Sequence, residues 1–380
     1  MKKILIINAV PLNNGDAALV FSLYESFKKY GFQPEIASFY FRQVKKIYSE
    51  YPVINDLTNF RLLNKIPYNR YLKIVLIPFL FVFNRSYRSA DVIVSSPGGY
   101  LNSYYGFSRV AVTLITAKIL GKKTAVYAQS VGPLNKRDTY LLRLLSKFTD
   151  VICARDNFSF DLLKKLKIKT TKIQQLVDAA FLLPFNKHDR DRPSGKVAVS
   201  VRSWKHDNRD PQKYFELIKG IVGELIAMNY KIEFVSTCQG IAGYIDDQKV
   251  AAEIVNELTP EQQESVIVDE EYHKLNGLQD KLRQYDAVIG TRMHMCILSM
   301  INGVPAFNIS YEVKGKEMYN SLGLSDFCID YNEAPETARL KLLNFILTLP
   351  ACSKNLESLI TEQNRKAEDD FKNFIARLGI

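Results

Sequence analysis

The chain of 380 residues contains few cysteines, and they lie far apart in the sequence. There are five, an odd number, and none belongs to a C-x-x-C pair: Cys153, Cys238, Cys296, Cys328 and Cys352. This pattern disfavours a disulfide framework and a zinc site, and it favours a reducing compartment. We therefore expect a cytoplasmic protein with no bound metal and no resident cofactor.

Long apolar runs are also missing. The longest, Ile74 to Phe83, has ten residues and includes Pro78, whereas a helix needs roughly 20 to cross a bilayer. A second run, Ile4 to Ile7, is too short for the core of a signal peptide and is better interpreted as a first strand. The sequence predicts no spanning segment.

Three common catalytic or cofactor motifs are absent. The chain has no G-x-G-x-x-G, no G-x-x-x-x-G-K-[ST] and no G-x-S-x-G. Their absence disfavours dinucleotide binding by the usual loop, a P-loop nucleotidase and a serine hydrolase of the strand-turn-helix type.

Charge is what the chain does have, and it is uneven. The net charge of +11 divides into +17 for residues 1–190, with 29 Lys/Arg against 12 Asp/Glu, and −6 for residues 191–380, with 22 against 28. Such asymmetry predicts that the first half faces an anionic partner. Nucleic acid, an anionic membrane and a phosphorylated substrate are the alternatives. No nucleic-acid-binding motif accompanies the charge, so we expect no nucleic acid partner.

Short, continuously apolar runs alternate with helical stretches along the whole chain. This alternation predicts parallel sheets covered by helices on both faces. A polar stretch with two prolines and a glycine, Pro184 to Lys196, is the best linker candidate. We therefore expect two Rossmann-like, doubly wound domains, 1–185 and 196–345, followed by an amphipathic helix at 353–378 that packs back on the first.

Ligands of open parallel sheets sit beyond the carboxyl ends of the strands, so the residues that follow each strand are the candidates for a site. In the second half, Arg202 follows one predicted strand. Arg292 and His294 lie where another strand passes into a helix, and Lys314 follows a third. Arginine, histidine and lysine at one sheet edge indicate a site for a small, highly charged anion. The structural alternative is a helix cap and a solvated lysine.

Several residues of the first half lie at corresponding positions. Arg155 follows a strand and is a candidate ligand-binding residue, although it could pair with a neighbour, and Asp156 is expected to cap the next helix. The remaining candidates are expected in loops at the same edge: Asn14, Gly15 and Asp16 after the first strand, then Gly98 with Gly99, and Gln129 with Ser130. A turn and a helix start near Ala17 would explain the first group without chemistry.

Taken together, these motifs resemble those of a known family. GTRMH is followed after eight residues by GVP and after five more by YEVK, and NNGDAA, SSPGG, QSVGP, ARD and VDAA precede them in order. This series, from about Asn13 to Leu324, resembles the polysaccharide pyruvyl transferase family. The resemblance implies a GT-B-like fold, with two Rossmann-like domains facing across a cleft.

The resemblance also implies an activity and roles for individual residues. The expected reaction moves the pyruvyl group of phosphoenolpyruvate onto two sugar hydroxyls as a cyclic ketal and releases phosphate. Arg155, Arg292 and Lys314 match family positions that surround phosphoenolpyruvate, and Arg202 is a further candidate on the donor side. His294 is the candidate general acid/base, because histidine exchanges protons near neutral pH. Asp16 is a hypothetical base for the sugar hydroxyls. The second domain is the expected phosphoenolpyruvate side and the first the expected acceptor side, with these residues in acceptor-side or cleft loops: Asn14, Gly15, Gly98, Gly99, Gln129 and Ser130.

The acceptor implied by the resemblance is a glycan precursor of a surface polysaccharide, often carried on a polyprenyl diphosphate. The sequence does not identify the sugar, the hydroxyl pair or the ketal stereochemistry. A GT-B glycosyltransferase with a nucleotide-sugar donor is the alternative function. It would need an acidic residue for the ribose, and none stands out in the second half.

One segment of the first half suggests a membrane contact. Residues 57–90 contain six Lys/Arg, no acidic residue and the apolar run with Phe79 and Phe81. This composition is typical of a segment that rests on anionic lipid, which predicts a peripheral position at the inner face of the cytoplasmic membrane. A buried pair of helices beneath a basic surface is the alternative.

Overall fold

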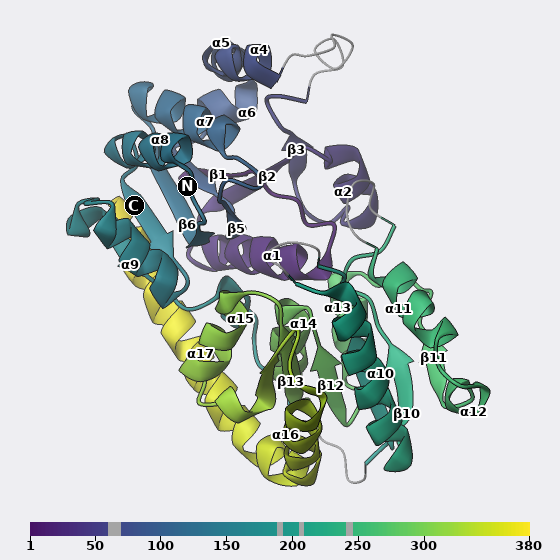
Figure 1. Cartoon of the computed structure of the whole chain (residues 1–380). Coiled ribbons are helices and arrows are strands. Elements are labelled where there is room, and N and C mark those ends of the chain that lie inside the picture. Colours follow the sequence, from purple (N-terminus) through teal and green to yellow (C-terminus); the bar gives the residue numbers. More distant parts are fainter. Residues whose placement is uncertain (60–69, 188–192, 205–208, 241–245) are drawn as a thin grey trace. The chain divides into compact units, whose positions relative to one another are not determined.

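A computed structural model describes the chain except for residues 60–69, 188–192, 205–208 and 241–245. It divides into two compact units (Figure 1). Unit 1 consists of Met1–Leu12, Asp16–Leu182 and Arg365–Ile380, and unit 2 of Asn13–Gly15 and Leu183–Asn364. The chain therefore passes from one unit to the other just before the predicted linker.

Unit 1 is built around an eight-stranded sheet in the order β3-β2-β1-β4-β6-β7-β8, with β5 paired to β6. Its strands are β1 (Lys3–Ile7), β2 (Gln33–Ser38), β3 (Val53–Asn55), β4 (Val92–Ser95), β5 (Gly98–Leu101), β6 (Lys123–Val131), β7 (Val151–Ala154) and β8 (Ile173–Gln175). Its helices are α1 (Asn14–Lys29), α2 (Phe41–Ile47), α4 (Arg70–Val75), α5 (Ile77–Phe83), α6 (Arg85–Ser89), α7 (Ser108–Ile119), α8 (Lys136–Lys147) and α9 (Asn157–Lys165), with short 3-10 turns η1 (Thr170–Lys172) and η2 (Ala179–Leu182).

Unit 2 is built around a six-stranded sheet in the order β11-β10-β9-β12-β13-β14. Its strands are β9 (Lys196–Ser200), β10 (Lys231–Phe234), β11 (Val266–Val268), β12 (Ala287–Gly290), β13 (Ala306–Ser310) and β14 (Cys328–Asp330). Its helices are α10 (Pro211–Ala227), α11 (Asp247–Asn256), α12 (Pro260–Gln263), α13 (Leu275–Leu282), α14 (Met293–Ile301), α15 (Val313–Ser321), α16 (Pro335–Leu347) and α17 (Leu349–Leu378), with the 3-10 turn η3 (Ser325–Phe327).

Every strand pairing in the two sheets is parallel, which confirms the predicted fold class of two doubly wound α/β units. The apolar residues of β9 and β12 pack with α10, α11 and α16 in a core of buried residues, and those of β1, β4 and β7 pack with α5 and α7 in another. None of the described helices combines the length and the apolar character that crossing a membrane requires.

Four strands were not expected from the sequence. β3, β8 and β14 have three residues each and lie at sheet edges, so they lack the long apolar run that marks a strand buried on both faces. The fourth, β5, contains Gly98 and Gly99, which we expected in a loop.

Other expected loops also lie in regular elements. Gln129 and Ser130 belong to β6. Asn14 and Gly15 are the first two residues of α1, so the predicted turn is wrong. The helix begins three residues before the predicted start at Ala17. The predicted cap is confirmed, because the Asp156 carboxylate accepts a hydrogen bond of 2.7 Å from the Ser159 backbone N–H.

The C-terminal helix α17 is longer than expected. It begins at Leu349 rather than at 353, because a proline in the first helical turn lacks only a hydrogen bond that would not form there anyway. Its last part belongs to unit 1. There the Asp370 carboxylate accepts from the Val177 backbone N–H at 2.9 Å, and the Phe371 ring meets the Phe27 ring edge to face at 5.1 Å between centroids.

Asp330, at the end of β14, is held by several donors. Burial alone would raise the pKa of its carboxyl, but hydrogen bonds from Arg209, the Asn332 backbone and Lys316 outweigh burial and lower the pKa to about 2. A lowered folded-state pKa means that the ionised carboxylate stabilises the protein above about pH 4 and that this stabilisation is lost as the pH falls.

We expect Asp330→Asn to lower the free energy of unfolding at neutral pH by about 1–2 kcal/mol. The difference from wild type should shrink as the pH falls from about 5 to about 2, because the carboxyl of the unfolded chain binds its proton near pH 4 while that of the folded protein stays ionised until about pH 2. Urea unfolding of both proteins over this pH range measures it. Asp326→Asn, at an exposed position in η3, is the matched control and should show neither effect. A difference that does not depend on pH would contradict the assignment.

Candidate active site

The strand order reverses at the centre of the unit 2 sheet, which is where a ligand crevice is expected. The chain runs from β9 outward through β10 and β11 and then returns to β12 on the other side of β9. Ligands of open α/β sheets bind where the strand order reverses in this way. In register, Ser200 of β9 lies beside Gly290 of β12, and Arg202 and Arg292 follow these two residues. The sheet topology thus brings two of the predicted residues to one point.

The helix that follows β12 begins at this point. Six of the nine residues of α14 are large apolar side chains that are all buried, as expected for a helix inside the fold. Gly290 permits its close approach, because a Cβ there would lie 2.5 Å from Cys296 Sγ. Arg292 is the N-cap residue and makes no side-chain cap, and the positive end of the helix dipole of α14 lies at this residue.

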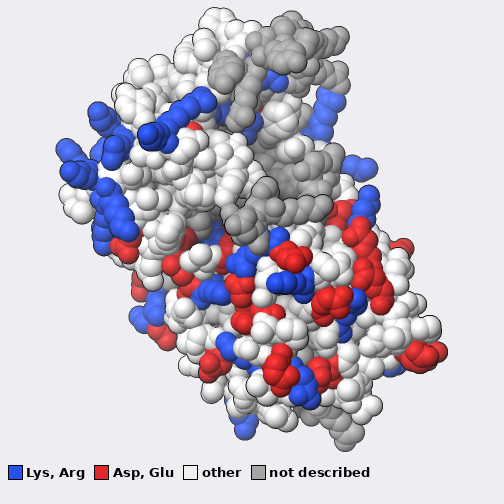
Figure 2. Space-filling view, in the orientation of Figure 1, with Lys and Arg blue, Asp and Glu red and all other residues white. Residues whose placement is uncertain are grey.

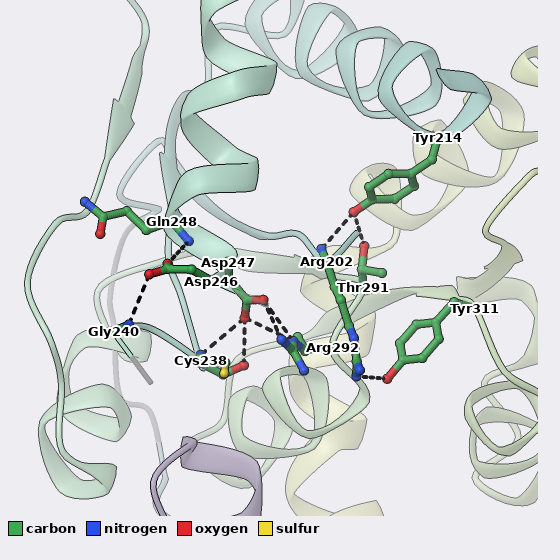
Figure 3. A network of polar contacts seen from close by, with 11 residues as sticks. Arg202, Tyr214, Cys238, Gly240, Asp246, Asp247, Gln248, Thr291, Arg292 and Tyr311 are labelled. Carbon is green, nitrogen blue, oxygen red and sulfur yellow. Dashed lines mark hydrogen bonds and ion pairs between the residues drawn. The ribbon is translucent and has the colours of Figure 1, made fainter. Parts of the chain in front are cut away.

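Arg292 is held by a buried carboxylate that the sequence did not indicate. Its Nε and Nη2 donate to Asp247 Oδ2 and Oδ1 at 3.0 and 2.5 Å (Figure 3), and the Asp247 side chain is 1% exposed. The Cys238 backbone N–H donates to Oδ2 at 3.2 Å. Burial raises the pKa of Asp247, opposed chiefly by Arg292. Burial alone would lower the pKa of Arg292, but the carboxylate outweighs it and the pKa is raised, so the pair is ionic.

Arg202 is held by neutral groups. Its Nη1 donates to the Tyr311 hydroxyl at 2.5 Å, and its guanidinium carbon lies 4.9 Å from the Trp204 ring centroid and 4.8 Å from that of Tyr311. The Arg202 backbone N–H donates to the Tyr214 hydroxyl at 3.2 Å. This hydroxyl shares a further hydrogen bond of 2.6 Å with Thr291 Oγ1 (Figure 3). Arg202 Nε is buried with no hydrogen-bond partner among the described residues.

Arg202 and Arg292 both act on the carboxylate of Asp247. Arg202 is one of the groups that lower the pKa of Asp247, so both guanidiniums act on the same carboxylate. Among the three described side chains Arg202, Arg292 and Asp247, two cations share one anion, which leaves a sum of +1 for this group. Ser200 Oγ is a second buried atom with no hydrogen-bond partner in the described part of the chain. Buried polar atoms of this kind call for a ligand or water, and the role of this group in binding an anion stays a prediction.

His294 is the second residue of α14 and is half-buried. Gly15, which belongs to unit 2, determines the space for its ring, because a Cβ on Gly15 would lie 2.9 Å from both His294 Cβ and Nδ1. Asn14 is attached to the same unit, since its backbone N–H donates to the Thr237 carbonyl at 2.9 Å and its amide to the His273 carbonyl at 3.0 Å. The NNG segment of the sequence therefore has a packing role beside His294.

Lys314 lies in the first turn of α15. Its Nζ pairs with Glu312 at 2.7 Å, and both side chains are partly exposed. Tyr311, from the same YEVK motif, is the residue that contacts Arg202. The donor role of Lys314 stays a prediction.

Arg155 has a different environment, in unit 1. Its Nη1 pairs with Asp178 at 2.9 Å, with the two side chains only 4% and 6% exposed, and its Nε donates to Ser130 Oγ at 2.8 Å. Ser130 Oγ donates to the Asp156 carboxylate at 2.7 Å. This arrangement matches the alternative that Arg155 pairs with a neighbour. A donor contact for Arg155 stays a prediction.

The other candidates of unit 1 belong to regular elements there. Gln129 is fully buried, and its amide donates to the Ser96 carbonyl at 2.6 Å. Gly98 is in register with Gln129. Asp16 lies in the first turn of α1. Contacts of these residues with an acceptor stay predictions.

Sequence reasoning missed Asp247, Tyr214 and Thr291. Asp247 follows Asp246, and the pair resembles an ordinary acidic helix start, which Asp246 does provide as the N-cap of α11. Tyr214 lies within the apolar face of α10 and looks like a core residue. Thr291 stands inside the GTRMH motif, but only its contact with Tyr214 reveals its position.

The chain is similar to proteins of known sequence and structure. The family model for polysaccharide pyruvyl transferase matches residues 13–313. The chain is 24% identical over 285 residues to the amylovoran biosynthesis protein AmsJ of Erwinia amylovora, covering 71% of this chain and 68% of that protein.

Solved structures of similar fold include HepE of Anabaena in complex with UDP, with a TM-score of 0.63 and 11% identity over 99% of this chain and 100% of that one. Another is the UDP-GlcNAc 2-epimerase of Methanocaldococcus jannaschii, with a TM-score of 0.59 and 13% identity over 91% and 93%. These likenesses establish a GT-B-like fold, and the family match covers most of the chain. The chain belongs to the polysaccharide pyruvyl transferase family.

Proposed function

We propose that this transferase moves the pyruvyl group of phosphoenolpyruvate onto two hydroxyls of a sugar as a cyclic ketal and releases phosphate. One observation carries the proposal: two guanidiniums share the Asp247 carboxylate beside the amino end of α14, and one of them has a buried Nε with no hydrogen-bond partner among the described residues. A carboxylate or phosphate oxygen would satisfy Arg202 Nε and offset the net positive charge. Phosphoenolpyruvate carries both groups on three carbons.

The chemistry requires a proton donor and an anion clamp. Protonation of the enol C3 makes it a methyl group and leaves a cation at C2. One sugar hydroxyl attacks C2 and loses its proton, the bond between C2 and the phosphate oxygen breaks, and the second hydroxyl attacks C2 while its proton leaves with phosphate. We assign the first proton transfer to His294, with Arg202, Arg292 and Lys314 holding the anion as charge develops on phosphate.

The acceptor is proposed to be a glycan precursor of a surface polysaccharide, carried on a polyprenyl diphosphate. Support comes from the family and from the name of the Erwinia relative, a biosynthesis protein for amylovoran. Incubation of a lipid-linked glycan with phosphoenolpyruvate, followed by mass spectrometry, tests the reaction. One added pyruvyl group supports it. Consumption of a UDP-sugar instead, with phosphoenolpyruvate unchanged, would point to the glycosyltransferase alternative.

We expect His294→Ala to reduce turnover by at least about 100-fold and to leave phosphoenolpyruvate affinity within about threefold of wild type, because general acid catalysis contributes to the chemical step. The single tryptophan of the chain provides the binding assay, since Trp204 lies against the Arg202 guanidinium and its fluorescence should respond to an anion there. Substantial residual turnover would remove His294 from the mechanism.

Arg292→Lys should weaken phosphoenolpyruvate binding by about tenfold or more. An ammonium is a point charge and cannot satisfy both oxygens of Asp247 while facing a ligand, so the geometry of the clamp is lost. Titration of Trp204 fluorescence measures the affinity. Arg339→Lys is the matched control, because Arg339 forms an exposed pair with Glu224 on the same unit. Wild-type affinity in Arg292→Lys would exclude the clamp.

Gly15→Ala is expected to lower turnover by about tenfold or more without weakening phosphoenolpyruvate binding, because the added Cβ would displace the His294 ring. Steady-state kinetics together with Trp204 titration separates the two effects. Gly220→Ala in α10, where a Cβ meets no atom within 4 Å, should retain wild-type activity. Equal activity of both variants would show that the position of the His294 ring does not limit the reaction.

A further inference from the structure

Helix α5 of unit 1 has two different faces. Ile77 and Phe81 are buried, and Phe81 meets the buried Tyr87 ring edge to face at 5.5 Å between centroids. The expectation that Phe81 faces lipid is therefore wrong, because its side chain belongs to the protein core. The helix is anchored through this face against α7 (Figure 1).

The opposite face is apolar and exposed. Val75 is 72% exposed, Phe79 62% and Phe83 72%, and these residues follow one another at intervals of four along α4 and α5. The two phenylalanine rings lie 4.6 Å apart. Leu72 and Val82 extend this apolar patch, which we define as Leu72, Val75, Phe79, Val82 and Phe83. Adjacent large apolar residues on a surface mark an interaction site.

Cations dominate the segment that forms the apolar patch and α6. Arg85 and Arg88 of α6 are exposed, and Lys122 Nζ donates to the Arg88 carbonyl at 2.7 Å, which adds a third cation. Between Asp56 and Asp91 the sequence contains no acidic residue. On the face shown in Figure 2, Lys and Arg stand out over unit 1 with little Asp or Glu beside them, whereas unit 2 carries both signs.

We propose that the apolar patch of α4 and α5 and the cations Arg85, Arg88 and Lys122 form a docking surface for an anionic lipid bilayer. Aromatic rings on one side of a surface helix enter the boundary between headgroups and acyl chains, while arginines and lysines nearby attract anionic headgroups. Residues 57–90 contain six Lys/Arg and no acidic residue, a composition that a protein partner of mixed charge would not require. The proposal does not depend on the donor or on the chemistry of unit 2.

Flotation with vesicles of phosphatidylcholine and phosphatidylglycerol at about 100 mM salt tests the proposal, with pure phosphatidylcholine vesicles beside them. We expect the full chain to float with the anionic vesicles and to be released at about 500 mM salt. Phe79→Ser with Phe83→Ser, and separately Arg85→Glu with Arg88→Glu, should each reduce the bound fraction at least about fivefold. Thermal unfolding of both variants should match wild type, because the altered side chains are exposed.

Two matched controls separate this surface from general properties of the chain. Leu340→Ser with Leu347→Ser removes two exposed apolar side chains of α16, and Lys164→Glu with Lys165→Glu makes the same change in net charge on α9. Both should float like wild type. Failure of wild type to float, equal binding to uncharged vesicles, or equal loss in the controls would overturn the proposal. A dimer in light scattering that Phe79→Ser with Phe83→Ser dissolves would instead assign the patch to a second copy.

Discussion

The ion pair of Arg292 with Asp247 is the constraint on which the candidate site depends. A carboxylate that is 1% exposed must be paired, since removal of one partner from a buried pair typically costs about 3–5 kcal/mol. The two hydrogen bonds between the guanidinium and the carboxylate determine the orientation of the Arg292 fork and join the amino ends of α11 and α14. The cation is therefore in position before any ligand arrives, which reduces the ordering cost of binding.

Three arginines follow strands in this chain, and their surroundings differ. Arg155 forms a buried ion pair with Asp178, so its charge is neutralised within unit 1. Arg292 has Asp247, whereas Arg202 has aromatic rings and a hydroxyl but no carboxylate hydrogen-bonded to it among the described residues. Aromatic faces stabilise a cation without neutralising it. The difference explains why the unit 2 crevice keeps a positive charge, although the second half of the chain is net acidic.

The same distinction applies to the basic first half. Its net charge of +17 is a sum over cations in different surroundings. Lys118 pairs with Asp150, and Arg155 is buried. Arg85 and Arg88 are exposed next to an apolar helix face. Net charge therefore indicates an anionic partner, but only the positions of individual cations show which of them could contact that partner.

The sequence by itself determined the fold class and supplied the candidates for the site. Alternating apolar runs and helical stretches predict two parallel sheets, and the ends of the central strands identify Arg202, Arg292 and His294, because this information is local. The edge strands β3, β8 and β14 were beyond its reach, since each contains at most two apolar residues, whereas the equally short β11 is apolar throughout.

Tertiary structure decided how those residues are held. Asp247 lies 45 residues before Arg292, and Tyr311 lies 109 residues after Arg202. Only the order and register of the strands bring such partners together. The sequence did not show which face of α5 is buried, because a run of ten apolar residues has no polar face to indicate its orientation. Packing alone determined that Phe81 is buried and Phe79 exposed.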